Sequence, residues 1–152
     1  MKIIREEKTT LTASAEFCVR FSEVDAMNIV WHGNYALYFE DAREVFGDKY
    51  NIGFHDIVNA GYAAPLVELS INYKQPLLYG QTAKVDVFYK NTEAAKVILE
   101  YEIRNIENNA LIATGRTVQV FIDKQNQLVL TNPEFYLEWK RKNGINNKRC
   151  SL

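Results

Sequence analysis

Cysteine and histidine are scarce in this sequence, and long apolar runs are missing from it. The 152 residues include two cysteines and two histidines. Cys18 and Cys150 stand far apart, so no disulfide framework is implied and a reducing cytoplasm is the simplest location. His32 and His55 lack the spacing of metal ligands, so no zinc site is expected. No apolar stretch approaches the roughly 20 residues of a membrane span, and the charged start of the chain lacks the apolar segment of a signal peptide.

Motifs of several common chemistries are also missing. The sequence has no G-x-S-x-G elbow, no P-loop and no G-x-G-x-x-G, which argues against a serine-hydrolase elbow and the usual nucleotide sites. Its 18 basic and 19 acidic side chains nearly cancel, whereas nucleic-acid binding needs a concentrated positive surface. The protein is therefore expected to work without a tightly bound cofactor, metal or nucleic acid.

What remains is the composition of an ordinary globular protein, with 47% apolar and 24% charged residues. The length fits one domain over residues 1–152, with a core from about 13 to 140. Residues 13–21 alternate apolar and polar side chains, as a half-buried strand does. A helix is predicted over about 34–47, with Gly47 as its terminator. Its apolar positions form one stripe at Tyr35, Tyr38, Phe39, Ala42, Val45 and Phe46.

Strands dominate the second half of the chain. A short helical turn is expected around 54–60, followed by strands over about 67–73, 84–90, 96–104 and 111–122. The connections at 75–80, 91–93 and 105–109 are short enough to make successive strands antiparallel neighbours. A last helix should start at Asn132-Pro133-Glu134, with Asn132 as its cap, and end near Lys142, before a polar tail from Gly144. This order predicts an α+β fold in which one antiparallel sheet of about five strands curls around a well-covered long helix.

The connection between the first strand and the long helix, Asp25-Ala-Met-Asn-Ile-Val-Trp-His-Gly-Asn-Tyr35, groups the polar residues best suited to chemistry. Functional residues tend to lie on such connections. If the helix begins near Gly33 or Asn34, the free amides of His32 to Tyr35 point out of its N-terminus, where they suit a developing oxyanion. Asp25 lies one loop back. A carboxylate facing the same point can attack a carbonyl carbon or activate water, which is the minimum for acyl transfer.

This segment resembles the signature of the 4-hydroxybenzoyl-CoA thioesterase family of hotdog folds. The similarity is carried by Asp25-x-x-x-Ile-Val-Trp-His-x-Asn-Tyr and the following Glu40-x-x-Arg43, then by residues 71–81, 113–116 and 120–123. These pieces occur in the family's order over about residues 13–140. The resemblance implies a sheet wrapped around a central helix, a homodimer or homotetramer formed through sheet edges, and active sites at the subunit interface.

The resemblance also implies hydrolysis of acyl-CoA or acyl-carrier thioesters to a free acid and a thiol. In that family the aspartate matching Asp25 is the nucleophile or general base, and the amide matching His32 is the oxyanion donor. Asn28 replaces the family's usual glycine, which implies a positive φ that asparagine tolerates. The rest of the segment is expected to contact the substrate, namely Asn28, Val30, Trp31, Gly33, Asn34 and Tyr35, with Asn34 also the expected helix cap.

Other interpretations of these residues stay open. Asp25 can be a turn residue that binds its own backbone, and Glu40 is a rival catalytic carboxylate unless it pairs with Arg43. Glu23 is expected to be a solvated neighbour, and Cys18 is expected to be unreactive. His55 should lie in a loop or be partly buried. The basic pairs and runs near the C-terminus, Lys140-Arg141-Lys142 and Lys148-Arg149, should be solvated surface or contact CoA phosphates.

Two other functions compete with hydrolysis. The first is a hotdog protein that binds acyl-CoA or an acyl carrier without cleaving it, which the departure at Asn28 keeps open. The second is a hotdog dehydratase, which is less expected because the long helix has no matching histidine motif.

Overall fold

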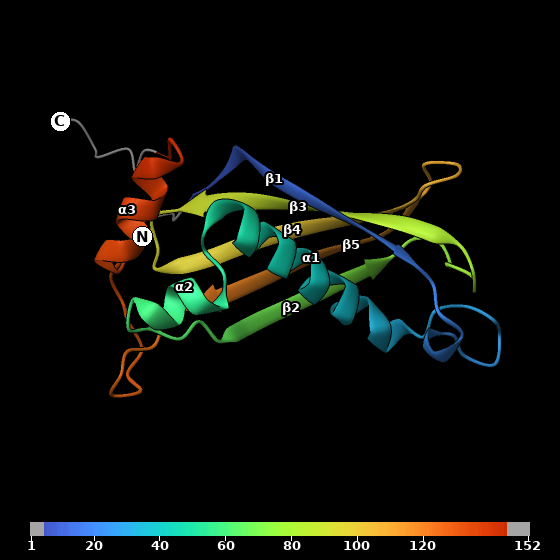
Figure 1. Cartoon of the computed structure of the whole chain (residues 1–152), viewed down its shortest axis with the longest axis horizontal. Helices are drawn as coiled ribbons and strands as arrows, with labels where there is room; N and C mark the ends of the chain where they lie inside the picture. Colours follow the sequence, from blue (N-terminus) through green and yellow to red (C-terminus); the bar gives the residue numbers. More distant parts are fainter. Residues whose placement is uncertain (1–4, 146–152) are drawn as a thin grey trace.

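The computed structural model describes residues 5–145 as a five-stranded antiparallel sheet curled around one long helix (Figure 1). The strands are β1 (Glu6–Cys18), β2 (Leu66–Tyr73), β3 (Thr82–Thr92), β4 (Lys96–Asn105) and β5 (Leu111–Val120). The helices are α1 (Tyr35–Tyr50), α2 (Phe54–Asn59) and α3 (Glu134–Lys142), with 3-10 turns η1 (Phe21–Glu23) and η2 (His32–Asn34) ahead of α1. The predicted order of one strand, one long helix and four strands is confirmed.

The order of strands across the sheet is β1-β3-β4-β5-β2. The prediction that successive strands pair is therefore confirmed for β3–β4 and β4–β5 and is wrong for β2–β3. The connection from β2 to β3 crosses the end of the sheet instead of forming a hairpin. Its Leu77 is fully buried, and the Leu77 carbonyl accepts the Val30 N–H at 2.8 Å. This crossing leaves β1 and β2 as the two edge strands.

The core lies between the sheet and the buried stripe of α1. The Phe39 ring stacks on Tyr101 at a centroid distance of 4.6 Å, and it packs so closely on β5 that a Cβ at Gly115 would lie 2.3 Å from the ring. Two apolar residues of α1 remain in the open, since Leu37 is 57% and Val45 is 39% exposed. The expectation that α1 is well covered is therefore wrong on one side, because no element among residues 5–145 packs there.

α1 continues one turn beyond the predicted end. Gly47 is a buried helical residue, not the terminator, and a Cβ there would lie 2.8 Å from the Gly53 Cα. Glycine at this position lets the chain after the helix pass close to it. Asn51 ends the helix in the left-handed conformation (φ 58°), with its N–H bound to the Gly47 carbonyl.

α3 packs at the end of the sheet far from the start of α1 (Figure 1). Three side chains reach from this region to the β3–β4 hairpin. The Asn132 amide donates to the Glu93 carbonyl at 2.9 Å, the Lys140 ammonium to the Thr92 carbonyl at 2.8 Å, and the Tyr136 hydroxyl to the Lys96 carbonyl at 2.8 Å. Asn132 is therefore not the cap, because Pro133 occupies that position.

Lys140 is 1% exposed, so the prediction of a solvated Lys140 is wrong. It follows Tyr136 by one helical turn and its ammonium lies 4.7 Å from the centre of that ring, which places it on the buried face. Arg141 is exposed and pairs with Glu138 at 2.6 Å. The other predicted basic pair, Lys148-Arg149, lies outside the described residues, as does Cys150.

The burial of Lys140 makes stability depend on pH. Burial lowers the pKa of its ammonium from 10.5 to about 8. Between these values the unfolded chain binds the proton that the folded chain has lost, so stability rises with pH in that window. We expect the free energy of unfolding of the wild type, minus that of Lys140→Met, to increase by about 1 kcal/mol from pH 7 to pH 9 in urea titrations. A constant difference would contradict the burial of a titrating ammonium.

Candidate active site

Asp25 begins a tight turn between two short extended segments. The Asp25 N–H donates to the Ile29 carbonyl at 2.9 Å, the Asn28 N–H donates to the Asp25 carbonyl at 3.0 Å, and Val24 and Val30 form an antiparallel bridge. Asn28 closes the turn with φ 62°. The positive φ implied by the family's glycine is confirmed, and asparagine is a residue that tolerates it. The substitution at position 28 therefore keeps the turn.

The Asp25 side chain uses one oxygen to hold this turn. Its Oδ1 accepts the Met27 N–H at 2.8 Å, which is the backbone-binding role considered for it. No hydrogen bond within residues 5–145 engages the other oxygen. The half-buried carboxylate thus keeps one oxygen available for another partner.

The first long helix begins through η2 with two unused amides. The Trp31 carbonyl accepts the Asn34 N–H at 2.9 Å. The prediction that the Asn34 amide is free is therefore wrong. The amides of His32 and Gly33 donate to no acceptor in the part of the chain that the structure describes. Of the three amides from His32 to Asn34, the two unused ones are therefore neighbours.

The carbonyl of Glu23 fixes the position of this helix start. It accepts both the Trp31 N–H at 2.9 Å and the Asn34 side-chain amide at 2.8 Å. Asn34 occupies the N-cap position as expected, although its side chain makes no capping bond. Through these two bonds to the Glu23 carbonyl, the loop after β1 is held against the start of α1.

Glu23 itself is half-buried, so the neighbour expected to be solvated is solvated only in part. Its carboxylate accepts the Arg20 N–H at 2.8 Å. Burial, and then the nearby Glu23 charge, raise the pKa of Tyr38 well above 10. Tyr38 is therefore a neutral hydroxyl at neutral pH, placed under the loop.

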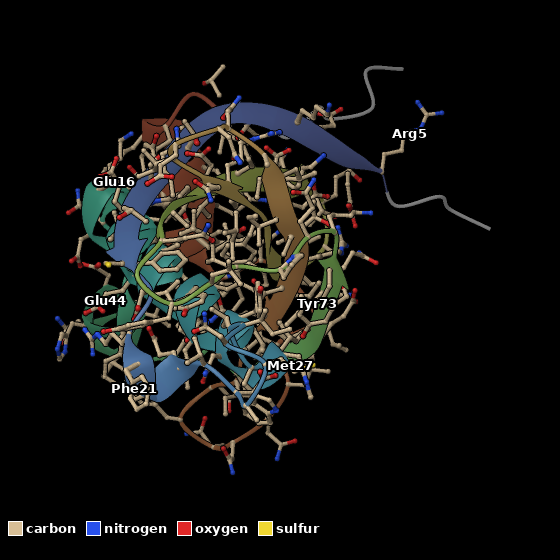
Figure 2. All side chains as sticks on the ribbon, turned by 90° about the vertical axis from the view of Figure 1, so that its right-hand side faces the viewer. Arg5, Glu16, Phe21, Met27, Glu44 and Tyr73 are labelled. Atoms are coloured by element: carbon tan, nitrogen blue, oxygen red, sulfur yellow. The ribbon has the colours of Figure 1, made fainter. Side chains whose placement is uncertain are left out.

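The remaining predicted contact residues divide into buried and exposed groups. Val30 and Tyr35 are buried in the core. Trp31 is 50% exposed, and its ring lies across Gly33 so closely that a Cβ there would be 2.1 Å from it. The His32 ring is exposed beside the Trp31 ring, at 4.9 Å between centroids. Figure 2 looks onto this end of the molecule, where Met27 from the loop and Tyr73 from β2 are labelled.

A cavity of about 490 Å³ lies along the middle and C-terminal part of α1, away from the Asp25 turn. Glu40 lines it and pairs with Arg43, as the i, i+3 spacing suggested. The His55 side chain, exposed on α2, also lines this cavity, so His55 is neither in a loop nor partly buried. Ala64 and Gln119 close it at the start of β2. Sequence patterns gave no sign of this cavity, because its walls come from four separate segments.

Two negative findings hold for residues 5–145. No three histidine, cysteine, aspartate or glutamate side chains gather in a way that could hold a metal ion. No helix in this range is long and apolar enough to cross a membrane.

Cys18 is exposed as a free thiol that points toward backbone carbonyls, the nearer being that of Gly80 at 3.7 Å.

Comparison with known proteins shows consistent similarities. A family model described as the thioesterase-like superfamily matches residues 19–140. A Bacillus subtilis protein provisionally named acyl-CoA thioesterase YneP is 28% identical over 124 residues, 82% of this chain and 89% of its own. An Aquifex aeolicus protein provisionally named an esterase is 36% identical over 120 residues, 79% of this chain and 91% of its own. The crystal structure of a DHNA-CoA thioesterase from Staphylococcus aureus is 28% identical with a TM-score of 0.76, over 86% of this chain and 89% of its own. The predicted hotdog arrangement is thereby confirmed.

Proposed function

The chain belongs to the thioesterase-like superfamily, whose model spans residues 19–140, and we propose that it hydrolyses acyl-CoA or acyl-carrier thioesters with Asp25 as the catalytic carboxylate. One observation carries the assignment of Asp25. A carboxylate with an unused oxygen stands on the turn that leads directly to two adjacent unused amides, those of His32 and Gly33. Acyl transfer needs an attacking or proton-accepting group and donors for the charge on the carbonyl oxygen.

Two routes fit this arrangement. In the first, Asp25 takes a proton from water, the hydroxide bonds to the acyl carbon, the C–S bond breaks, and the thiolate leaves and regains the proton. In the second, Asp25 attacks the acyl carbon and expels the thiolate, and water then cleaves the resulting anhydride. In both, the His32 amide donates to the oxygen that gains negative charge. We propose that no metal or other cofactor takes part, because these amides supply the charge stabilisation.

Replacement of Asp25 tests the central assignment. Asp25→Asn keeps an oxygen that accepts the Met27 N–H, so the turn and the fold should be retained. The variant cannot attack or accept a proton, and we expect the kcat on a good acyl-CoA substrate to fall about 10²-fold or more. Release of free thiol measures the rate, and thermal unfolding checks the fold.

The chain contains a matched control. Asp123 makes the same turn as Asp25, since its Oδ1 accepts the Gln125 N–H at 2.9 Å and Asn126 follows with φ 64°. Asp123→Asn should keep full activity, which separates the chemistry of Asp25 from its turn. If Asp25→Asn turns over at the wild-type rate, and Glu40→Gln loses activity instead, the catalytic carboxylate lies on α1.

We propose further that the protein acts as a homodimer, or as a tetramer built from such dimers, joined through the free edge of β2. This strand is exposed along most of its length and includes apolar side chains at Leu66, Val67, Leu69 and Tyr73. The uncovered Leu37 and Val45 of α1 add further exposed apolar surface. An exposed apolar edge strand is a template for pairing with another strand, so a lone subunit is disfavoured.

Twofold symmetry then completes the site. Two copies of one edge strand related by a twofold axis pair antiparallel, which places the Leu66 end of β2 beside the partner's Tyr73 end. The cavity at Ala64 and Gln119 lies at the Leu66 end, and the start of α1 lies at the Tyr73 end. Each cavity would therefore receive the helix start of the other subunit. Its volume of about 490 Å³ is of the size that holds a small acyl group.

Charges on β2 test this assembly. The double variant Val67→Lys, Leu69→Lys should shift the molar mass in light scattering to that of one chain and lower kcat/KM at least tenfold, because each site loses its partner. Leu130→Lys is the matched control, since Leu130 is 81% exposed and lies outside β2. A wild-type chain that is monomeric at micromolar concentration and fully active would contradict the proposal.

We also propose which class of acyl group the enzyme cleaves. The cavity carries the Glu40–Arg43 pair, His55 and Gln119, which suits an acyl group with its own hydrogen-bonding groups. The resemblance to 4-hydroxybenzoyl-CoA thioesterases and the DHNA-CoA thioesterase among the similar structures favour a hydroxylated aromatic acyl group.

A panel of thioesters in the presence of EDTA tests class and cofactor together. We expect free thiol from hydroxylated aromatic acyl-CoAs at least tenfold faster than from aliphatic acyl-CoAs of similar size, with EDTA having no effect. Loss of turnover with EDTA would overturn the metal-free route. Binding without any thiol release would favour the alternative function, an acyl-CoA or acyl-carrier binding protein that does not hydrolyse its ligand.

A cytoplasmic location also stays a prediction. It is supported by Cys18, whose thiol is free and exposed, because exposed thiols persist in reducing compartments.

A further inference from the structure

Tyr73, the last residue of β2, reaches from the sheet edge to the start of α1. Its hydroxyl donates to the His32 carbonyl at 2.7 Å. Its partner on β5 is Ala113, a buried residue, so the Tyr73 side chain projects toward the helix side of the sheet. The Tyr73 ring meets the Tyr35 ring edge-on, at 5.0 Å between centroids. The hydroxyl is thus held in place by packing at its ring.

The bond to the His32 carbonyl sets the direction of an amide. In a trans peptide the C=O and the N–H of one plane point in opposite directions. The His32 carbonyl and the Gly33 N–H share such a plane, so a donor on that carbonyl turns the Gly33 N–H away from β2. The preceding plane is fixed in the same manner, because the Trp31 carbonyl accepts the Asn34 N–H and leaves the His32 N–H pointing away.

We propose that Tyr73 is a positioning residue of the thioesterase site, which holds the His32–Gly33 peptide so that the Gly33 N–H joins the His32 N–H as a second oxyanion donor. This inference rests on the proposed function. It is favoured by the finding that both amides lack acceptors among residues 5–145, while the carbonyl of each plane has a donor. Glycine at position 33 fits the same arrangement, because the Trp31 ring occupies the space of a Cβ.

Tyr73→Phe removes the hydroxyl and keeps the ring against Tyr35. Without this bond the His32–Gly33 peptide can rotate, and the Gly33 N–H loses its alignment with the oxyanion. This alignment matters more in the transition state than in substrate binding, so we expect kcat to fall about tenfold with KM unchanged. Affinity for a thioether analogue of the substrate, which has no carbonyl beside sulfur, should stay at the wild-type value. A weaker thioether affinity together with a lower melting temperature would mean a general structural role and would overturn the proposal.

Tyr79→Phe is the matched control. Tyr79 lies at the same end of the molecule, is 53% exposed, and its ring contacts Phe21. Its hydroxyl makes no hydrogen bond within residues 5–145. This variant should keep the wild-type kcat and KM. An equal loss in both variants would show that the effect does not come from the His32 carbonyl.

A second measurement does not depend on turnover. The amide ¹⁵N signal of Gly33 reports a hydrogen bond to the His32 carbonyl, so Tyr73→Phe should move it and Tyr79→Phe should not. If the wild type cleaves thioesters but neither kcat nor the Gly33 signal responds to Tyr73→Phe, the positioning role of Tyr73 is wrong. The proposed thioesterase function is then retained. If the wild type cleaves no thioester, the proposed function fails and the oxyanion role fails with it, whatever the Gly33 signal shows.

Discussion

The Glu23 carbonyl is the point on which the geometry of the candidate site depends. It receives one donor from the backbone of Trp31 and one from the side chain of Asn34. Together these bonds close the loop that carries Asp25 and fix the first turn of α1 against it. The other long-range bonds of this loop, from the Val30 N–H to the Leu77 carbonyl and in the bridge between Ile29 and Leu78, tie it to the β2–β3 connection and not to the helix. A carbonyl with two lone pairs thus joins the carboxylate to the amides.

The turn at Asp25 is not distinctive in itself, and the chain demonstrates this. Residues 123–127 repeat its hydrogen bonds, with the Asp123 N–H bound to the Gln127 carbonyl at 3.0 Å and the Asn126 N–H bound to the Asp123 carbonyl at 3.0 Å. The second copy leads into a loop that bridges back to Ile122, whereas the first leads into α1. A candidate site therefore differs from a structural turn in the element that the turn leads into.

Periodicity predicted the elements well, because alternation and helical stripes depend on which face is buried. It could not give the order of strands, and it missed that Lys140 is buried while Leu37 is exposed, since both depend on which distant element packs there. The positive φ at Asn28 was predictable, because the family's glycine marks a backbone constraint. The bond from Tyr73 to His32 spans 41 residues and left no local pattern, and only the folded chain brings the two together.

The same strand serves two purposes in the proposed assembly. β2 offers an unpaired edge to a second copy, and its last side chain holds the peptide at the start of α1. An isolated edge strand has hydrogen-bonded support on one side only, so its end is free to fray. Pairing with a second β2 would remove that freedom and steady Tyr73, and through it the His32–Gly33 peptide. Assembly would then do more than enclose the cavity. The strand that joins the subunits, β2, also carries the side chain that orients the amides of His32 and Gly33.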